Sequence, residues 1–296
     1  MRIVITGGAG FIGSSFVHLC VERGYDVLVV DKFTYASDIK NLPGTLDVFD
    51  ILIKDICDVT PSDLGEYDYL VNFAAESHVD NSIKDGRPFV RTNVEGTFNL
   101  LECARKNPKL KRFIQISTDE VYGDLELSMY GESETHDPMR PSSYYSSTKA
   151  SADLLVESCG RTYGLPYLIT RTCNNFGIRQ HSEKFIPTLI RSIKEGNLVP
   201  IYGDGQQSRE WIWVEDNVRT ILDLMEQNPD ENVHHIGSGY TIKNIDIVKM
   251  AGGACEFIED RLGHDRKYRL HSDTKTTLTL EQYLKEQLDE TSTNRT

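Results

Sequence analysis

The stretch that decides the fold is Ile3-Val-Ile-Thr-Gly-Gly-Ala-Gly-Phe-Ile-Gly13, with a helical pattern over Phe11–Arg23. A short apolar run leads directly into glycines that satisfy both G-x-x-G-x-x-G and G-x-G-x-x-G. Glycine suits a tight strand-to-helix turn, because a pyrophosphate can approach bare backbone there and bind the N–H groups of the helix N-terminus. The next apolar run, Val27–Asp31, ends in a carboxylate that can accept hydrogen bonds from the adenosine ribose and repel a 2′-phosphate. The pattern therefore predicts NAD, and not NADP, as cofactor.

Outward from this turn, short apolar runs alternate with amphipathic stretches such as Pro88–Lys106. The predicted strands are Ile3–Thr6, Val27–Asp31, Ile51–Lys54, Tyr69–Ala75, Arg112–Thr118, Tyr167–Cys173 and Val233–Ile236. Strand–helix alternation with continuous apolar strands is typical of a parallel sheet covered on both faces. We therefore expect an α/β fold with a Rossmann-type doubly wound parallel sheet.

Glycine, proline and asparagine become more frequent after about residue 172. This change predicts an NAD-binding domain over 1–172, to which 211–237 returns, and a smaller, shortened α/β substrate-binding domain over 173–296, interleaved with it. Trp211 and Trp213 alternate as in a strand and are assigned to the core. His234 and His235 receive no catalytic role.

Composition narrows the function classes. The 296 residues include 32 Lys+Arg and 45 Asp+Glu, a net charge of −13 that argues against a nucleic-acid partner. No apolar run approaches the length of a membrane span, and the first residues lack the apolar region of a signal peptide. The six cysteines form no C-x-x-C and the eight histidines no metal-binding cluster, so we expect reduced thiols, a cytoplasmic location and no metal.

Tyr145 and Lys149 form a Y-x-x-x-K pair, whose side chains share one helix face. An ammonium beside a phenol favours the phenolate, and such a phenol can take a proton from a sugar hydroxyl while hydride leaves the same carbon. The alternative is an exposed helix pair without function.

Thr118, Asp119 and Glu120 follow the predicted strand Arg112–Thr118, at the edge where open parallel sheets bind ligands. Two adjacent carboxyl groups there favour pKa separation, with one group protonated as an acid and the other ionised as a base. The alternative is a solvated acidic loop.

These residues together resemble the extended short-chain dehydrogenase/reductase family, and within it the dTDP-glucose 4,6-dehydratases. The resemblance runs to about residue 270 through TGGAGFIGS (6–14), DKFTYA (31–36), DICD (55–58), NFAAESHVDNSI (72–83), TNVEGT (92–97), STDEVYG (117–123), PSSYYSSTKAS (141–151), RTCNNFGIRQHSEKFIP (171–187), SREWIWVEDN (208–217), KNIDIV (243–248) and DRLGHDRKY (260–268). The tandem acid in STDEVYG distinguishes the dehydratases from related enzymes, since related epimerases carry small residues there and related decarboxylases typically have Ser at the place of Asp119.

The resemblance implies a nucleotide-sugar 4,6-dehydratase that acts on dTDP-glucose or UDP-glucose in deoxysugar biosynthesis, that of rhamnose included. Tyr145 would deprotonate the C4 hydroxyl, with Lys149 keeping it acidic and Thr118 holding the C4 oxygen. Glu120 would then remove the C5 proton and Asp119 would protonate the departing C6 hydroxyl.

Further positions carry over one by one. The cofactor-binding set is Gly7, Gly10, Phe11, Ile12, Gly13, Asp31, Lys32, Thr34, Asp55, Ile56, Ala74, Ala75, Ser77, Thr92, Tyr145 and Lys149. The substrate-binding set is His78, Thr118, Asn174, Glu183, Lys184, Arg209, Asn244, Arg261 and His264. Helices over 88–106 and 145–163 are expected to pair with their symmetry mates in a homodimer.

The chain also departs from typical family members. Residues 124–140 and 247–260 are compact, the segment after Tyr268 is hard to align, and Ile178-Arg179-Gln180-His181 replaces a more usual Pro-Tyr-Gln pattern. Two alternatives stay open beside the dehydratase. One is a 4-epimerase or decarboxylase on the same scaffold, and the other is a catalytically silent NAD-binding protein.

Overall fold

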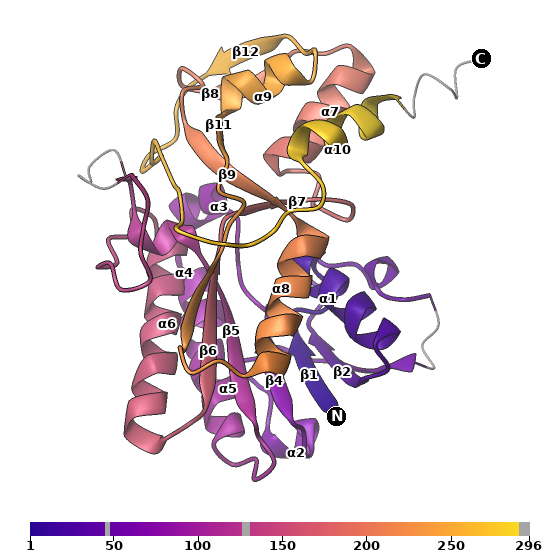
Figure 1. The fold of residues 1–296 in the computed structure, drawn as a ribbon, viewed down its shortest axis with the longest axis vertical. Helices are drawn as coiled ribbons and strands as arrows, with labels where there is room; N and C mark the ends of the chain where they lie inside the picture. The colour runs from indigo at the N-terminus through magenta and orange to yellow at the C-terminus, as the bar shows by residue number, and fades with distance from the viewer. Residues whose placement is uncertain (45–47, 126–130, 290–296) are drawn as a thin grey trace.

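The protein, a computed structural model that describes residues 1–44, 48–125 and 131–289, is built on one seven-stranded parallel sheet (Figure 1). Its strands are β1 (Arg2–Thr6), β2 (Asp26–Asp31), β3 (Asp50–Ile53), β4 (Tyr69–Asn72), β5 (Arg112–Thr118), β6 (Tyr167–Thr172) and β10 (Val233–Ile236). Their order is β10-β6-β5-β4-β1-β2-β3. The strand order reverses beside β1, which places the crevice of a doubly wound sheet at the carboxyl end of that strand. The predicted fold class is confirmed.

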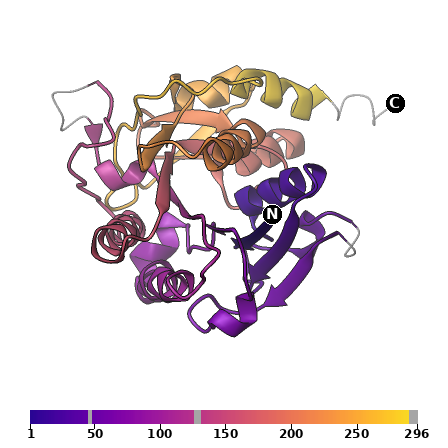
Figure 2. The same cartoon turned by 60° about the horizontal axis from the view of Figure 1, so that its bottom comes forward.

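Strand alternation sends the side chains of this sheet into two separate cores. Ile3 and Val29 pack with α1 (Phe11–Glu22) and α8 (Val214–Gln227), whereas Val4 and Val30 face the opposite core. That second core is shared with α5 (Thr97–Ala104) and α6 (Tyr144–Tyr163). Figure 2 shows these helix pairs on either side of the sheet. Both faces are buried, as the unbroken apolar strands require.

The predicted helix over 88–106 forms in three parts, α4 (Arg87–Phe89), the π-helical η3 (Val90–Gly96) and α5. A Cβ at Gly96 would lie 2.5 Å from Ile56 Cδ1, so the backbone passes that side chain closely. Asn93 in the widened turn accepts a hydrogen bond from Glu76 N at 2.8 Å. A π-turn of this kind is common at functional sites, and here it lies beside the end of β4. The remaining short elements of this half are α2 (Pro61–Leu64), α3 (Val79–Lys84), η1 (Ile39–Asn41) and η4 (Asp119–Tyr122).

Two small sheets and a third core lie above the large sheet in Figure 1. The first small sheet has the order β11-β9-β7, and the second pairs β12 with β8. The strands are β7 (Asn174–Phe176), β8 (Val199–Tyr202), β9 (Ser208–Trp213), β11 (Thr241–Lys243) and β12 (Cys255–Ile258), and the helices are α7 (Phe185–Glu195), α9 (Asn244–Met250) and α10 (Leu280–Asp289). Leu280, Tyr283 and Leu284 of α10 are buried in this core, so the last described helix completes it despite the shortened sequence.

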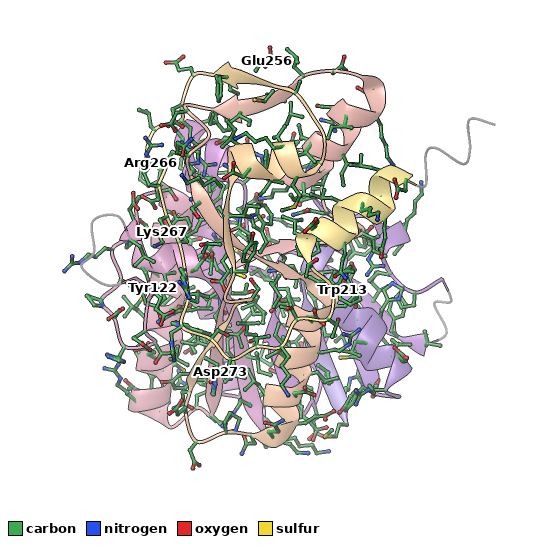
Figure 3. All side chains as sticks on the ribbon, turned by 45° about the horizontal axis from the view of Figure 1, so that its top comes forward. Tyr122, Trp213, Glu256, Arg266, Lys267 and Asp273 are labelled. Atoms are coloured by element: carbon green, nitrogen blue, oxygen red, sulfur yellow. The ribbon has the colours of Figure 1, made fainter. Side chains whose placement is uncertain are left out.

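The chain crosses between the layers more than once. Trp213, labelled in Figure 3, ends β9 and is the N-cap residue of α8. Helix α8 packs on α1, and β10 then pairs with β6 in the large sheet. These contacts favour the expected return of 211–237 to the first domain, and the boundary at residue 172 stays a prediction. Part of the compact loop 124–140, namely 126–130, and the last residues, 290–296, lie outside the described residues. No helix in the described ranges combines the length and apolar composition that crossing a bilayer requires.

Candidate active site

A cleft of about 700 Å³ lies along the carboxyl edge of the large sheet, where β1 to β6 end, and reaches into the smaller layer. Its lining includes every residue that the sequence analysis assigned to catalysis, cofactor or substrate. Residues from the glycine turn, from five other strand ends, from α6 and from the smaller layer thus come together in one place. The roles of the individual residues remain predictions.

Two glycines of the turn after β1, Gly7 and Gly13, are packed too closely for any larger residue. Gly7 has φ +67° and a Cβ there would lie 2.6 Å from Ala74 N, while a Cβ at Gly13 would lie 2.2 Å from Gly7 O. Helix α1 begins after Gly10 with no side chain capping it and no acidic residue in its first turn. Its N-terminal N–H groups and its dipole are therefore available to an anion such as a pyrophosphate.

Asp31 at the end of β2 also organises this turn. Its carboxylate accepts hydrogen bonds from Ala9 N at 3.0 Å, from Phe33 N at 2.8 Å and from Ser37 Oγ at 3.1 Å. A carboxylate has about four acceptor sites, so one remains for a ribose hydroxyl. The bond to Ala9 was not anticipated from the sequence, because it depends on how β2 lies beside β1.

Lys32, Asp55 and Thr92 form a polar group farther along the cleft. Lys32 Nζ lies 3.4 Å from both Asp55 Oδ2 and Thr92 Oγ1. Burial raises the pKa of Asp55, but hydrogen bonds from Cys57 and the charge of Lys32 outweigh it, so the pKa is lowered overall. The carboxylate therefore stays ionised and can accept a hydrogen bond from a base or ribose.

Tyr145 and Lys149 reach the cleft from the first turns of α6, whose start is fixed by a capping box between Ser143 and Ser146. Lys149 Nζ donates to Ile116 O at 2.5 Å, and burial lowers its pKa to about 8. The pKa of Tyr145 is raised well above its usual value, first by burial and then by the negative charge of Glu120. The lowering of this pKa by Lys149 stays a prediction, because the net rise reflects burial and carboxyl charges. The ammonium is engaged by a β5 carbonyl, and burial beside two carboxyl groups dominates.

Asp119 and Glu120 lie among different charges, and the predicted separation of their pKa values stays a prediction. The pKa of Asp119 is raised far above its ordinary value by burial and by Glu120 and Glu210. Its Oδ1 accepts from Thr118 Oγ1 at 3.0 Å, while its Oδ2 is buried without a partner. Burial also raises the pKa of Glu120, but three nearby cations oppose the rise, namely Arg261, Arg209 and Lys184. Asp119 is therefore suited to be the proton donor, and Glu120 to be the base.

Those cations line the part of the cleft that faces the smaller layer. Lys184 Nζ donates to Ser77 O at 2.9 Å, Arg209 Nη2 donates to Asp265 O at 2.7 Å, and Arg261 Nη1 lies 3.2 Å from Asp80 Oδ1. Each cation keeps donor groups beyond these contacts. The cluster can thus bind a diphosphate inside a protein whose net charge is −13.

His264 and His78 are held among these charges. His264 Nδ1 lies 2.6 Å from Asp260 Oδ1, and burial together with Arg261 lowers its pKa to about 4. His78 Nε2 lies 3.8 Å from Glu183 Oε2, and its pKa is lowered by burial and by Lys184. Both rings therefore favour the neutral form near neutral pH and can serve as hydrogen-bonding groups.

Sequence reasoning missed several lining residues. Asp80 accepts from Tyr202 OH at 3.0 Å and pairs with Arg261, so it orients a predicted phosphate ligand. Its place two residues after His78 was a signal that could have found it. Trp211 was assigned to the core, and it is buried there and also faces the cleft.

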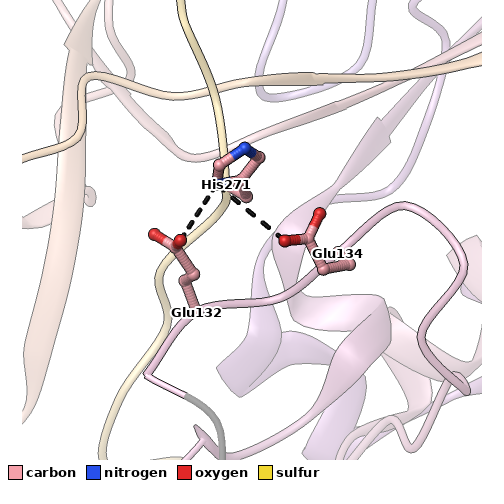
Figure 4. Close-up of side chains that lie close together, drawn as sticks. All are labelled: Glu132, Glu134 and His271. Carbon is pink, nitrogen blue, oxygen red and sulfur yellow. Dashed lines mark hydrogen bonds and ion pairs between the residues drawn. The ribbon is translucent and has the colours of Figure 1, made fainter.

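A second group of titratable side chains lies outside the cleft. Glu132, Glu134 and His271 are the one set of three potential metal ligands that lie close together within the described ranges (Figure 4). His271 Nδ1 lies 2.9 Å from Glu132 Oε1, and Arg269 Nε lies 3.5 Å from Glu132 Oε2. Arg269 supplies positive charge to these carboxylates, and the carboxylates raise the pKa of His271, so the group is accounted for as a surface polar cluster.

The seven-stranded sheet with its glycine turn, the Tyr-x-x-x-Lys pair on α6 and the acids after β5 define an extended short-chain dehydrogenase/reductase. Residues 3–237 match the model of the NAD dependent epimerase/dehydratase family, and the chain belongs to that family.

Individual relatives agree with this assignment. The chain is 46% identical over 291 residues to the low-salt glycan biosynthesis protein Agl12 of Haloferax volcanii, covering 93% of this chain and 91% of the relative. It is 42% identical over 285 residues to a dTDP-glucose 4,6-dehydratase of Streptomyces griseus, covering 92% of this chain and 86% of the relative. Among solved structures it resembles DesIV, the dTDP-glucose 4,6-dehydratase of Streptomyces venezuelae crystallised with NAD, at a TM-score of 0.92 and 35% identity over 100% of this chain and 98% of that one.

Proposed function

We propose that this protein is an NAD-dependent nucleotide-sugar 4,6-dehydratase that converts dTDP-glucose, or UDP-glucose, to the 4-keto-6-deoxyglucose nucleotide and water. The observation that carries the proposal is the carboxyl pair of buried Asp119 and half-buried Glu120, whose neighbours differ in charge, beside Tyr145 and Lys149 in one cleft. An elimination needs an acid and a base in addition to the group that oxidises C4, and this cleft supplies all of them. The names of the curated relatives favour the thymidine nucleotide.

The cleft fits NAD. The uncapped start of α1 would bind the pyrophosphate, Asp31 the adenosine ribose, and Asp55 with Lys32 the adenine side. Thr34, Ile56, Ala74, Ala75 and Ser77 line the same part of the cleft. The chemistry supplied by bound NAD would be a hydride acceptor for C4 and a hydride donor for C6, with a positively charged nicotinamide that would lower the pKa of a nearby phenol.

Tyr145 would take the proton of the C4 hydroxyl while Thr118 holds the C4 oxygen. Lys149 would bind the nicotinamide ribose with the donors that Ile116 O leaves free. The resulting 4-keto group acidifies the C5 proton, which Glu120 would remove. Asp119 would then protonate the C6 hydroxyl through its unpartnered Oδ2, so that water leaves, and Glu120 would return its proton to C5 when the hydride reaches C6.

The diphosphate would lie against Lys184, Arg209 and Arg261. These three cations also lower the pKa of Glu120, so substrate phosphate that neutralises them would make Glu120 a stronger base. Substrate binding and base strength are therefore coupled. Glu183, Asn174 and Asn244 line the same region as further substrate contacts.

The alternatives predict different products. A 4-epimerase or decarboxylase has no need of a buried acid beside Glu120, and a silent NAD-binding protein has no need of any of the five catalytic groups. Purified protein incubated with dTDP-glucose and, separately, UDP-glucose should give a product lighter by one water, measured by mass spectrometry. Epimerisation would leave the mass unchanged, and an unchanged substrate with either nucleotide would contradict the proposal.

Association into a homodimer through α5 and α6 is part of the proposal. These helices lie side by side on the sheet and carry the exposed apolar residues Phe98, Leu154 and Tyr163, each more than half exposed. An apolar patch of this kind is typical of a surface that another protein covers.

We expect the parent protein to sediment as a dimer at micromolar concentration. The double substitution Phe98→Asp with Leu154→Asp should convert it to a monomer, because charge would be buried in the interface. Phe257→Asp, which changes an equally exposed aromatic residue in the smaller layer, is the matched control and should leave the dimer intact. A parent protein that sediments as a monomer would rule the dimer out.

We also propose a cytoplasmic location, supported by the six cysteines, all of which are free. The product would be a precursor for deoxysugars, and rhamnose is one candidate end product.

A further inference from the structure

Asp153 is a buried carboxylate that the proposed mechanism does not use. It lies on α6 one helical turn after Lys149, and its exposed fraction is 0%. Its Oδ2 accepts from Ser117 Oγ at 2.9 Å and from Arg171 Nε at 3.0 Å. Burying a charged side chain this completely costs free energy unless its partners are specific, so its partners indicate what it does.

The first partner connects Asp153 to the catalytic turn. Ser117 is the residue directly before Thr118, Asp119 and Glu120, and its neighbour Ile116 supplies the carbonyl that binds Lys149 Nζ. Asp153 therefore joins the helix that carries Tyr145 and Lys149 to the strand end that carries the acid and the base. Two further hydrogen bonds join the same elements, that of Lys149 to Ile116 O and that of Tyr145 to Thr118.

The second partner of Asp153 is Arg171, which holds the carboxylate from β6. Arg171 of β6 donates to Tyr122 OH at 2.6 Å and to Thr135 O at 3.1 Å, and Tyr122 OH lies 2.6 Å from His235 Nε2. Tyr122, labelled in Figure 3, lies in η4, the turn that begins with Asp119. Arg171 is thus fixed on several sides and cannot withdraw from the carboxylate.

The remaining oxygen of Asp153, Oδ1, is buried and has no hydrogen-bond partner. Lys149, four residues earlier on the same helix face, is attracted by this carboxylate, whose charge opposes the effect of burial on the ammonium. The charged groups around Asp153 are Lys149, Tyr145 and Glu157 on α6, Arg171 on β6 and Tyr122 on η4.

We propose that Asp153 is a positioning residue of the dehydratase site, which holds the Thr118–Glu120 turn against α6 through Ser117 and keeps Lys149 charged. The inference rests on the proposed function. It accounts for a buried anion beside the site, because this carboxylate binds the end of β5 through Ser117 and lies one helical turn from the catalytic Lys149 on α6.

The test compares Asp153→Asn with the parent enzyme, with dTDP-glucose as substrate and dehydration measured over a range of pH. Asparagine keeps the shape and an acceptor for Ser117 but removes the charge, so the pKa of Lys149 should fall further below about 8. We expect kcat to fall roughly 10- to 100-fold with KM nearly unchanged, and the alkaline limb of the kcat profile to move down by about one pH unit.

Glu157→Gln is the matched control. Glu157 lies one turn farther along α6 and 3.9 Å from Arg171 Nη2, so it shares the ion-pair network without facing Lys149. This variant should keep the parent kcat and pH profile. A merely structural role for Asp153 would lower Tm without moving the pH profile, and that outcome would overturn the proposal.

Ser117→Ala tests the hydrogen bond between Asp153 and the end of β5. It is the deciding variant if Asp153→Asn does not fold. It removes one hydrogen bond while the Asp153–Arg171 pair stays. We expect kcat to fall several-fold with an unmoved pH profile, and parental kcat in this variant would overturn the proposal. Failure of the proposed function is recognised separately, because the parent protein would then form no dehydrated product at all.

Discussion

Tyr145→Phe should abolish oxidation of the sugar at C4, with a loss of kcat on the order of 10³-fold or more. The substitution removes only the phenolic oxygen, and general-base catalysis by such a group contributes about 10² to 10⁴ in rate. Because burial and Glu120 raise the pKa of Tyr145, the reactive phenolate is scarce at low pH. Oxidation by the parent enzyme should therefore increase as pH rises, until Lys149, with a pKa of about 8, loses its proton. The measurement is single-turnover appearance of reduced nicotinamide absorbance after mixing with dTDP-glucose.

Tyr144→Phe provides the control for this prediction. Tyr144 is adjacent in sequence but 63% exposed, and it does not line the cleft. Its loss should leave the rate of oxidation at the parental value. Normal hydride transfer in Tyr145→Phe would show that another group is the base. Tyr145→Phe should also retain Tm, since the aromatic ring and its edge contact with Phe89 remain.

Asp119→Asn should separate the two halves of the reaction. Elimination is expected to slow by about 10²- to 10³-fold, because an amide cannot donate the proton that the C6 hydroxyl needs. Oxidation at C4 should persist, since Tyr145, Lys149 and Thr118 are unchanged. Reduced nicotinamide and a 4-keto nucleotide of undiminished oxygen content should therefore accumulate, which absorbance and mass spectrometry can measure together.

Glu120→Gln is the contrasting variant for this pair. It should also stop dehydration, but it removes the base, so the C5 proton should no longer exchange with deuterated water. In Asp119→Asn that exchange should continue. Dehydration at the parental rate in Asp119→Asn would show that Asp119 is not the acid.

Stability gives an independent readout for Asp119. Its pKa is raised in the folded protein, so above its unfolded pKa the buried carboxyl destabilises the fold relative to an unperturbed one. An asparagine has no such penalty, and Tm of Asp119→Asn near neutral pH should be equal to or above that of the parent. A large fall in Tm would mean that the carboxyl is ionised and paired.

Local patterns in the chain were sufficient for much of this fold. All seven strands of the large sheet were predicted, because continuous runs such as Val27–Val30 are buried on both faces and turns of glycine separate them from helices. The predicted helix over 88–106 was less accurate, since its π-turn depends on the close approach of Gly96 to Ile56. That contact is absent from any local pattern.

The site residues divide in a similar way. Glycines, Asp31, the Tyr145–Lys149 pair and the tandem acid are recognisable because their chemistry depends on residue type and short spacing. Asp80 and Asp153 were not found, because their importance comes from partners such as Arg261 and Ser117 that are distant in sequence.

By itself, then, the sequence determined the class of fold, the glycine turn, and the set of groups able to oxidise a sugar and remove water from it. These follow from side-chain chemistry, periodicity and spacing along the chain. Only the tertiary structure decided the electrostatic state of those groups. It surrounds Tyr145 with burial and carboxyl charges that raise its pKa, gives Asp119 and Glu120 neighbours of different charge, and places Asp153 one helical turn after Lys149. Burial and the distances between charges on different elements control these pKa values, and both exist only once β5, β6 and α6 are packed together.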